Sequence, residues 1–207
     1  MHSLIVVAHP DPGSLTHAVA QRIAQGITAS GSGHSAELAD LVAEGFDPRF
    51  TMADQALFLK QAAAPADVAL EQQRIDRAQA LVIVYPVYWW SFPALLKGWI
   101  DRVFAQGWAY EETSDAKVVK KLRHLRVHLV GIGGANEGTY MRHGYAPAMK
   151  AQIDHGIFDY CGAEVHSSCL LLPADADSAA AHLDTAHKIG ASIFAPQPAT
   201  TQRQTCA

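Results

Sequence analysis

The stretch that decides the fold of this chain is VYPVYWWSFPALLKGWIDRVFAQGWAY, residues 84–110. It runs from an apolar strand through an aromatic loop into a helix, and it holds all four tryptophans of the chain. Pro86 and Pro93 fix the backbone on either side of the loop, and Pro93 falls where the first turn of the predicted helix Ala94–Phe104 tolerates proline. Aromatic rings at the carboxyl end of a strand can wall a planar ligand, and the same rings can instead pack in a core. The residues alone leave both interpretations open.

Short apolar runs without alternation predict the strands of a parallel sheet that is covered on both faces. These runs are Leu4–Ala8, Leu81–Tyr85, Val127–Ile132 and Val165–Leu172, with Ser35–Leu41 as a weaker strand. Helical spacing predicts five alternating helices, at Ala18–Ala29, Asp67–Arg77, Ala94–Phe104, Tyr145–Tyr160 and Ser178–Phe194, and a short helix at Asp54–Gln61 within a long connection. Right-handed crossovers then predict a doubly wound α/β sandwich with the five strands in the order 2-1-3-4-5.

The composition is typical of a soluble globular protein, with 49% hydrophobic and 17% charged residues and a formal net charge of -4. A single domain is predicted over residues 1–195, followed by a tail over residues 196–207 that we expect to be mobile. The chain has no basic field for nucleic acid and no apolar run long enough to insert into a membrane. Without a signal sequence, a cytoplasmic location is expected. The three cysteines and the scattered histidines predict neither a disulfide framework nor a metal site.

Two loops beside the aromatic loop also carry chemistry, because loops after the first, third and fourth strands meet at the switch point of such a sheet. HPDPGSLTH, residues 9–17, places hydroxyls and backbone N–H groups at the mouth of a helix, where they can hold a phosphate. Ser14 or Thr16 can equally serve only to cap that helix. GIGGANEGTYMRHGY, residues 131–145, has adjacent glycines that let a flat ligand approach the backbone. Its Tyr140 and His143 are either reactive groups or ordinary loop residues.

Taken together, these motifs resemble the flavodoxin-like NAD(P)H:quinone oxidoreductases of the DT-diaphorase type. The resemblance rests on the loop after the first strand, on residues 84–110 and on the Gly133-Gly134 pair. It extends to Phe46-Asp47-Pro48 and to the segment 67–72, which are similar to the branch of the family that uses FAD. The resemblance therefore implies a flavodoxin-like fold and a flavin cofactor, FAD with FMN as the alternative.

The resemblance also implies a role for each matching residue. The flavin phosphate or pyrophosphate would be held by His9, Ser14, Leu15 and Thr16. The isoalloxazine would be edged by Pro86, Val87, Tyr88 and Trp89, and on its other polar edge by Ile132, Gly133 and Gly134. The substrate pocket would be formed by Trp89, Trp90, Gly133 and Gly134, with Tyr110 reaching in from the other subunit of a homodimer. The catalytic residues would be Tyr140 and His143, near the flavin O2 edge.

The activity that the resemblance implies is two-electron hydride transfer from NAD(P)H through flavin N5 to a quinone or a similar acceptor, in a ping-pong sequence. An alternative is a regulatory flavoprotein that acts as the ancillary subunit of a membrane transport system. An α/β-hydrolase is disfavoured because the chain has no G-x-S-x-G elbow. One departure from the family pattern is Glu112, which stands where a second aromatic residue is expected after Tyr110.

Overall fold

Five parallel strands form the central sheet of the computed structural model, which describes residues 1–115, 117–173 and 178–195. They are β1 (His2–Val7), β2 (Ser35–Asp40), β3 (Ala80–Pro86), β6 (Arg126–Ile132) and β7 (Glu164–Leu171). Their order across the sheet is β2-β1-β3-β6-β7. Since β6 and β7 are the fourth and fifth strands of this sheet, the predicted order 2-1-3-4-5 is confirmed. The predicted tail over residues 196–207 lies outside the described residues.

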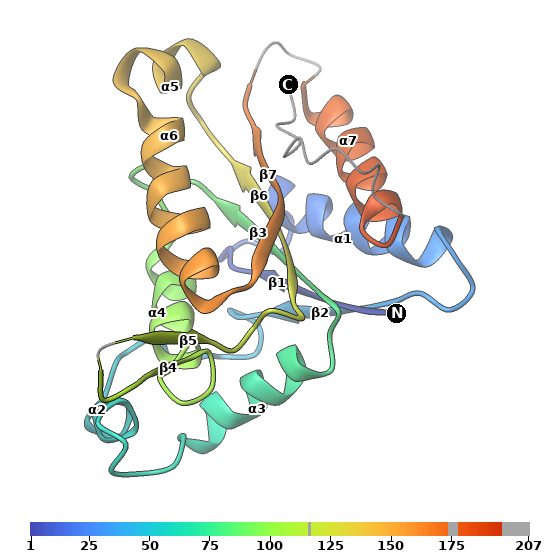
Figure 1. The fold of residues 1–207 in the computed structure, drawn as a ribbon. Coiled ribbons are helices and arrows are strands. Elements are labelled where there is room, and N and C mark those ends of the chain that lie inside the picture. The colour runs from blue at the N-terminus through green and yellow to red at the C-terminus, as the bar shows by residue number, and fades with distance from the viewer. Residues whose placement is uncertain (116, 174–177, 196–207) are drawn as a thin grey trace.

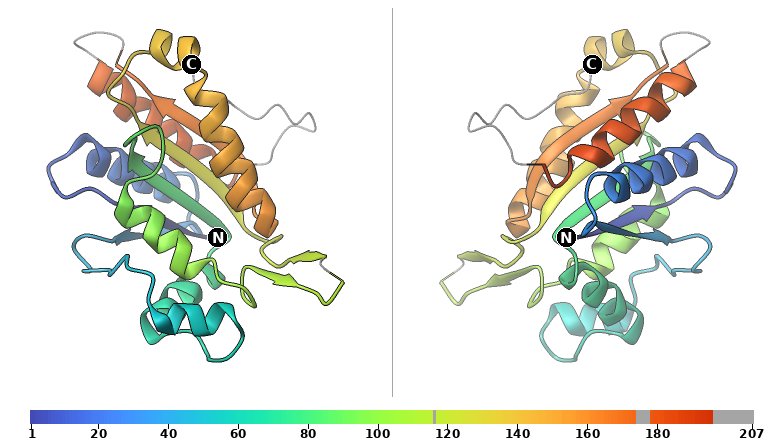
Figure 2. Two further views of the ribbon diagram at one scale, coloured as in Figure 1. Left: turned by 90° about the vertical axis from the view of Figure 1, so that its left-hand side faces the viewer. Right: turned by 90° about the vertical axis from the view of Figure 1, so that its right-hand side faces the viewer.

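Helices cover both faces of the sheet (Figure 1, Figure 2). One face carries α1 (Leu15–Ala29) and α7 (Ser178–Ser192), and the other carries α4 (Ala94–Val103) with α3 (Ala66–Asp76) beside it. Successive side chains of a strand point to opposite faces. In β1, Leu4 therefore packs into the cluster around α4, whereas Ile5 packs into the cluster around α1 and α7. This double burial explains why the strands read as unbroken apolar runs.

The helices α1 and α7 approach each other closely enough for their backbones to touch. A Cβ atom on Gly26 of α1 would lie 2.2 Å from the His187 carbonyl oxygen, and one on Gly190 of α7 would lie 2.1 Å from the Ile23 carbonyl oxygen. Both distances are far below any real carbon–oxygen contact. The two glycines therefore set the spacing between these helices.

Several elements differ from the sequence prediction. Helix α2 (Met52–Phe58) begins two residues before the predicted start at Asp54, because Thr51 and Asp54 form a capping box. The predicted single helix at Tyr145–Tyr160 is a short α6 (Tyr145–Met149) that continues as the π-helix η1 (Lys150–Asp159). A hairpin of β4 (Tyr110–Glu112) and β5 (Val118–Lys120), which the sequence did not predict, follows α4.

The predicted set of five helices was also incomplete after β6. The glycine-rich loop there contains a helix, α5 (Glu137–His143). The Asn136 side chain caps its start by accepting a hydrogen bond from the Thr139 N–H, at 3.1 Å. Gly144 ends it with a φ of 68°, a left-handed conformation that favours glycine. Tyr140 and His143 are consequently helical residues and not loop residues. No helix among the described residues has the length and apolarity needed to cross a bilayer.

A buried ion network ties the long connection before α3 to α4. Arg102 on α4 donates through Nε to Asp54 Oδ1 at 2.9 Å and through a terminal nitrogen to Asp67 Oδ2 at 2.6 Å. It also donates to the Asp47 carbonyl oxygen at 2.8 Å, and its guanidinium lies over the Phe46 ring at 5.3 Å. One cation thus holds α2, α3 and the chain between β2 and α2 in place.

His128 on β6 makes the stability of the fold depend on pH. Burial, and next the nearby His166 and Arg126, lower the pKa of His128 to about 3. Because the unfolded chain takes up this proton near pH 6.5 and the folded chain does not, stability is present above pH 6.5 and is lost below it. We expect the free energy of unfolding to fall by about 2 kcal/mol between pH 7 and pH 5, measured by urea titration.

The matched variants for this measurement are His128→Gln and His155→Gln. His128→Gln removes the buried imidazole and should flatten the pH dependence between pH 7 and pH 5. The side chain of His155 is 83% exposed, so its replacement should leave the dependence unchanged. An equal slope in the wild type and His128→Gln would contradict the assignment.

Candidate active site

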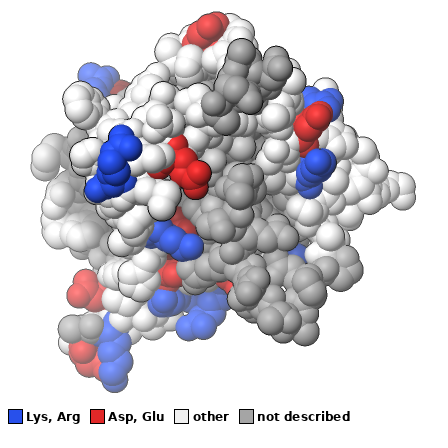
Figure 3. Space-filling view, turned by 90° about the horizontal axis from the view of Figure 1, so that it is seen from above, with Lys and Arg blue, Asp and Glu red and all other residues white. Residues whose placement is uncertain are grey.

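The candidate site lies where the loops after β1, β3 and β6 emerge at the carboxyl edge of the sheet. The chain leaves β1 toward α1 on one face and leaves β3 toward α4 on the other, so these two strands flank the topological switch point, where open α/β sheets bind their ligands. Figure 3 views the molecule from this edge and shows basic and acidic side chains in small separate groups. The described part of this face therefore carries no continuous field of one sign.

The loop after β1 presents hydrogen-bond donors at the N-terminus of α1. Ser14 is the N-cap residue, and its hydroxyl accepts from the His17 N–H at 3.3 Å. Asp11 shapes the loop, since its Oδ1 accepts from the Gly13 N–H at 2.8 Å. The N–H groups of Leu15 and Thr16 meet no acceptor in the described part of the chain. Two free amides and the helix dipole fit a phosphate group, whereas the side chain of Thr16 is buried.

The buried imidazole of His17 supports this loop from below. Its Nδ1 lies 3.0 Å from Ser14 Oγ, and its Nε2 lies 2.9 Å from Asp40 Oδ2 at the end of β2. The other oxygen of Asp40 accepts from the N–H groups of Val42 and Ala43. Burial opposes ionisation of Asp40, but the hydrogen bonds from His17, Ala43 and Val42 hold the pKa of this carboxyl below its usual value. Sequence reasoning singled out neither His17 nor Asp40.

The aromatic loop after β3 contains a strained turn. Tyr88 and Ser91 exchange two backbone hydrogen bonds, of 3.1 and 3.0 Å, around Trp89 and Trp90. The φ angles of these two tryptophans are 49° and 60°, which makes the turn type I′, a turn that normally takes asparagine or glycine. The Trp89 side chain is 93% exposed. The strained backbone thus presents an unpacked indole to solvent, as is typical of a functional loop.

Trp90 joins this loop to the residues after β6. Its ring stacks on Tyr145 at 3.7 Å with an interplanar angle of 11°, and it meets Tyr140 edge-on at 5.2 Å. The His143 ring also stacks on Tyr145, with 5.3 Å between the ring centres. Burial raises the pKa of Tyr140, so its hydroxyl stays protonated and able to donate. Tyr140 thus meets the aromatic loop directly, and His143 reaches it through Tyr145, which sequence reasoning did not identify.

The two glycines after β6, Gly133 and Gly134, have different surroundings. A Cβ on Gly133 would lie 2.6 Å from Tyr140 Oη and 2.6 Å from Leu172, whereas a Cβ on Gly134 would meet nothing within 4 Å. The strand ends hold this backbone in place, because the Val87 N–H donates to the Ile132 carbonyl oxygen at 2.8 Å. Bare backbone beside open space fits the edge of a flat ring such as an isoalloxazine.

A cavity of about 900 Å³ lies behind Tyr140, between α5, η1 and β7. Its polar lining includes Tyr85, Asp154 and Ser168, and the Ser168 hydroxyl donates to Asp154 Oδ1 at 3.3 Å. Burial, and next the negative charge of Asp154, raise the pKa of Tyr85 above its usual value. Tyr140 therefore forms a wall that this cavity shares with the aromatic loop.

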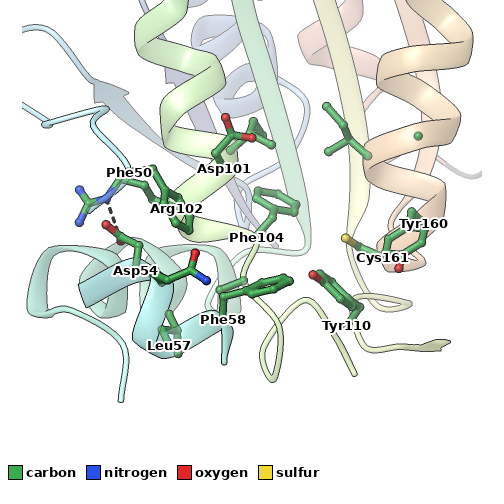
Figure 4. A pocket seen from close by; sticks show the side chains of 15 residues that line it. Phe50, Asp54, Leu57, Phe58, Asp101, Arg102, Phe104, Tyr110, Tyr160 and Cys161 are labelled. Carbon is green, nitrogen blue, oxygen red and sulfur yellow. Dashed lines mark hydrogen bonds and ion pairs between the residues drawn. The ribbon is translucent and has the colours of Figure 1, made fainter. Parts of the chain in front are cut away.

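Tyr110 lies away from the other predicted site residues of its own chain. It stands on β4, at the end of the molecule opposite the carboxyl ends of the strands (Figure 1). There it meets Tyr160 at 5.2 Å and lines a cavity of about 440 Å³ together with Phe58 and Cys161 (Figure 4). Glu112 ends the same short strand. The resemblance implies that Tyr110 reaches the site of a second subunit, and its place at this end of its own chain leaves that expectation as a prediction.

The segment that resembles the FAD-using branch is bound to α4. The Gln72 amide donates to the Val103 carbonyl oxygen at 2.9 Å, and Glu71 accepts from the Trp99 ring at 2.8 Å. Asp67 belongs to the Arg102 network described above. These polar groups serve the packing of α3 on α4, a role that the sequence did not reveal. No group of three or more histidine, cysteine, aspartate or glutamate side chains in the described ranges is placed to hold a metal ion.

The family model described as a flavodoxin-like fold matches residues 1–191. The chain belongs to the flavodoxin-like family. This flavodoxin-like chain is 31% identical over 165 residues to an "Uncharacterized NAD(P)H oxidoreductase" of Haemophilus influenzae, covering 79% of this chain and 80% of the relative. It is 29% identical over 185 residues to human ribosyldihydronicotinamide dehydrogenase (quinone), covering 78% and 77%.

A solved structure is similar as well. The NAD(P)H:quinone oxidoreductase from Methanothermobacter marburgensis superposes with a TM-score of 0.85 at 26% identity, covering 93% of this chain and 98% of that one. These matches confirm the resemblance to the flavodoxin-like NAD(P)H:quinone oxidoreductase family. They also identify this flavodoxin-like protein as an oxidoreductase enzyme.

The strained turn of this flavodoxin-like protein allows a prediction about stability and activity together. We expect Trp89→Asn to raise the free energy of unfolding by about 1 kcal/mol, because asparagine tolerates the left-handed backbone and the exposed indole has no packing to lose. The same change should lower kcat/KM for an aromatic acceptor, since it removes a stacking surface. Urea titration and steady-state kinetics measure the two effects.

The neighbouring variant Trp90→Asn is the control. It relieves the same kind of backbone strain but also removes the stack on Tyr145, so it should not be stabilising. Equal stabilisation by both changes would mean that the Trp90 ring contributes nothing to the loop.

Proposed function

We propose that this chain is a flavin-dependent NAD(P)H:quinone oxidoreductase. The observation that carries the proposal is that one edge of the sheet combines phosphate-binding amides at α1, a bare glycine backbone after β6 and an aromatic wall after β3. These three features match the ligands of a flavin enzyme: the flavin has a phosphate and a flat ring with polar edges, and the acceptor stacks on that ring. The names of the relatives agree with this assignment.

The residues of the chain divide the work of binding. Leu15 and Thr16 donate to the flavin phosphates, and Gly133 and Gly134 let the ring approach the backbone. A bound flavin supplies hydride acceptance at N5 and return of two electrons to the second substrate. Trp89 provides an exposed indole against which a planar quinone or nicotinamide can stack.

Two further residues act on charge. Tyr140 remains a neutral hydrogen-bond donor, and we assign it to the polar edge of the ring, where a donor stabilises negative charge that develops on reduction. We place His143 at the same edge, where its exposed imidazole can exchange a proton with solvent. Tyr145 stacks on both Trp90 and His143, and it therefore fixes the position of His143 relative to the aromatic loop.

A homodimer completes the proposed site. Tyr110 cannot take part in the site of its own chain from the opposite end of the sheet, so we assign it to the site of a second copy. Four exposed apolar side chains lie in and around α2, where a second copy could cover them: Phe50, Met52, Phe58 and Leu59. Sedimentation velocity should give twice the mass of one chain, and a monomer would remove Tyr110 from the proposal.

The experiment that tests the proposed function is an anaerobic absorption spectrum of the purified protein. Flavin bands near about 375 and 450 nm should bleach with NADH or NADPH and return with a quinone. Acid release and mass spectrometry then identify the flavin, which we propose is FAD, with FMN as the alternative. A protein that retains neither flavin, or a bound flavin that neither reductant bleaches, would refute the proposal.

A further inference from the structure

The trio Ser14, His17 and Asp40 joins the proposed phosphate site to a buried titratable group. His17 is 4% exposed and sits between a hydroxyl at the mouth of α1 and a carboxylate at the end of β2. The register of β1 with β2 pairs Val7 with Asp40, which brings the carboxylate level with the start of the loop after β1. The trio is therefore held by the N-terminus of α1, which carries Ser14 and His17, and by the end of β2, which carries Asp40.

The hydrogen positions in this trio follow from the chemistry of the three groups. An ionised carboxylate only accepts, so Nε2 of His17 must carry a hydrogen toward Asp40. In the neutral imidazole, Nδ1 then has no hydrogen and accepts one from the Ser14 hydroxyl. Ser14 Oγ already accepts from the His17 N–H. With neutral His17, the Ser14 hydroxyl thus has no hydrogen left for an anion.

Protonation of His17 reverses one of these bonds. Nδ1–H then donates to Ser14 Oγ, and the hydroxyl hydrogen of Ser14 is free to point toward the mouth of α1. A phosphate consists of acceptors and carries negative charge, so it prefers both the freed donor and the nearby cation. Asp40 stabilises that cation, because its carboxylate is already oriented by the amides of Val42 and Ala43.

From this geometry we infer that His17 is a positioning residue that couples binding of the flavin phosphate to uptake of one proton. The inference rests on the proposed flavin function and adds to it a role for a residue that touches the phosphate only through Ser14. Flavins that carry a phosphate should therefore bind more tightly as the pH falls, until His17 is protonated in the free protein.

Other titratable groups also face the imidazole and must be separated from it in the test. His9, in the loop after β1, has its ring centre 6.3 Å from that of His17. Asp11 lies in the same loop, and Asp40 is the carboxylate at the end of β2. His9 and Asp11 are unchanged in every variant below, so their contribution cancels when variants are compared.

The test compares flavin binding by the wild type and His17→Gln. Apoprotein is titrated with FAD and with FMN between about pH 5.5 and 8.5, and calorimetry in two buffers of different ionisation enthalpy counts the protons taken up. In the pH range in which His17 is neutral in the free protein and protonated in the complex, the wild-type Kd for FAD should fall about tenfold for each unit of pH lowered, beyond the change seen in His17→Gln. The difference between the two proteins also cancels the titration of the FMN phosphate itself.

Two controls isolate the contribution of His17 to proton uptake. Riboflavin has no phosphate, so its binding should take up the same number of protons in both proteins. His34→Gln removes another histidine that pairs with a serine, Ser30 Oγ at 2.8 Å, at the far end of α1, and it should bind flavin like the wild type. Should His17→Gln fail to fold, Asp40→Asn serves in its place, because it removes the charge that favours the imidazolium and should reduce proton uptake.

The outcomes separate the inference from the proposed function. Equal proton uptake by the wild type and His17→Gln, with both binding FAD or FMN, would overturn the role of His17 and leave the flavin function intact. Failure of the wild type to bind either flavin would refute the proposed function, and with it this inference. Extra uptake of close to one proton by the wild type, for FAD or FMN but not for riboflavin, is the expected result.

Discussion

Replacing Arg102 with leucine is expected to lower the free energy of unfolding by about 3–5 kcal/mol, because it leaves the buried carboxylate of Asp54 without its cation. The side chain of Arg102 is 5% exposed and that of its partner Asp54 is 1% exposed, so water cannot take the place of the guanidinium. The loss also releases the Asp47 carbonyl oxygen and the second carboxylate, Asp67. Urea titration monitored by circular dichroism measures the effect.

A surface pair on the same helix provides the control. Lys97 and Asp101 pair across one turn of α4 with side chains that are 42% and 45% exposed, so Lys97→Gln should cost no more than about 0.5 kcal/mol. Adding Asp54→Asn to Arg102→Leu should recover part of the loss, since the unpaired charge is then gone. A cost below about 1 kcal/mol for Arg102→Leu would show that solvent reaches the network.

Gly190→Val is expected to destabilise the fold by about 3 kcal/mol or more. Any Cβ at this position would lie 2.1 Å from the Ile23 carbonyl oxygen, and backbone of α1 cannot rotate out of the way as a side chain can. The two helices must therefore move apart and lose the apolar contacts of Ile23 and Ala186 on that face. Thermal and urea unfolding measure the change.

Gly33→Ala is the matched control for the glycine prediction. A Cβ there would meet nothing within 4 Å, so the unfolding free energy should stay within about 0.5 kcal/mol of the wild type. Gly26→Val, on the opposite helix of the same contact, should behave like Gly190→Val. A neutral result for both α1 and α7 variants would mean that the helices do not pack backbone to backbone.

The centre of the sheet could be predicted from the sequence because its signal is local. The strands β1, β3 and β6 are apolar runs, and burial on both faces leaves no alternation to confuse with a half-exposed strand. The sequence likewise offered Ser14 and Thr16 as candidates for the helix cap, and the structure shows Ser14 in that role. The start of α1 at Leu15, three residues before the predicted Ala18, follows directly from that cap.

Other features depend on contacts that a linear pattern does not contain. The start and stop signals of α5, Asn136 and Gly144, were present, but the glycines around them favoured a loop. The π-helix η1 keeps an apolar spacing close to that of an α-helix, so its wider turn is invisible in sequence. Strands β4 and β5 have three residues each, which is too few for an alternation of apolar and polar residues to be recognised.

The site was predicted only in part for the same reason. The aromatic loop and the glycine pair are each a continuous stretch of sequence, so each could be found by its own pattern. The structure brings the two stretches to one edge of the sheet. The partnership of His17 with Asp40 joins residues 23 positions apart and arises only when β2 pairs with β1. The left-handed backbone of Trp89 and Trp90 has no sequence signal, since tryptophan is among the residues least suited to it.

The position of β1 has a consequence for how the chain folds during its synthesis. The ribosome makes this strand first, yet it lies between β2 and β3 in the finished sheet. At usual elongation rates, about 80 further residues and roughly 4–16 s separate the emergence of β1 from that of β3. Until then one edge of β1 has no neighbour, and an unpaired apolar strand is a site for aggregation. Nascent chains that stall before residue 80 are therefore the form of this protein most in need of a chaperone.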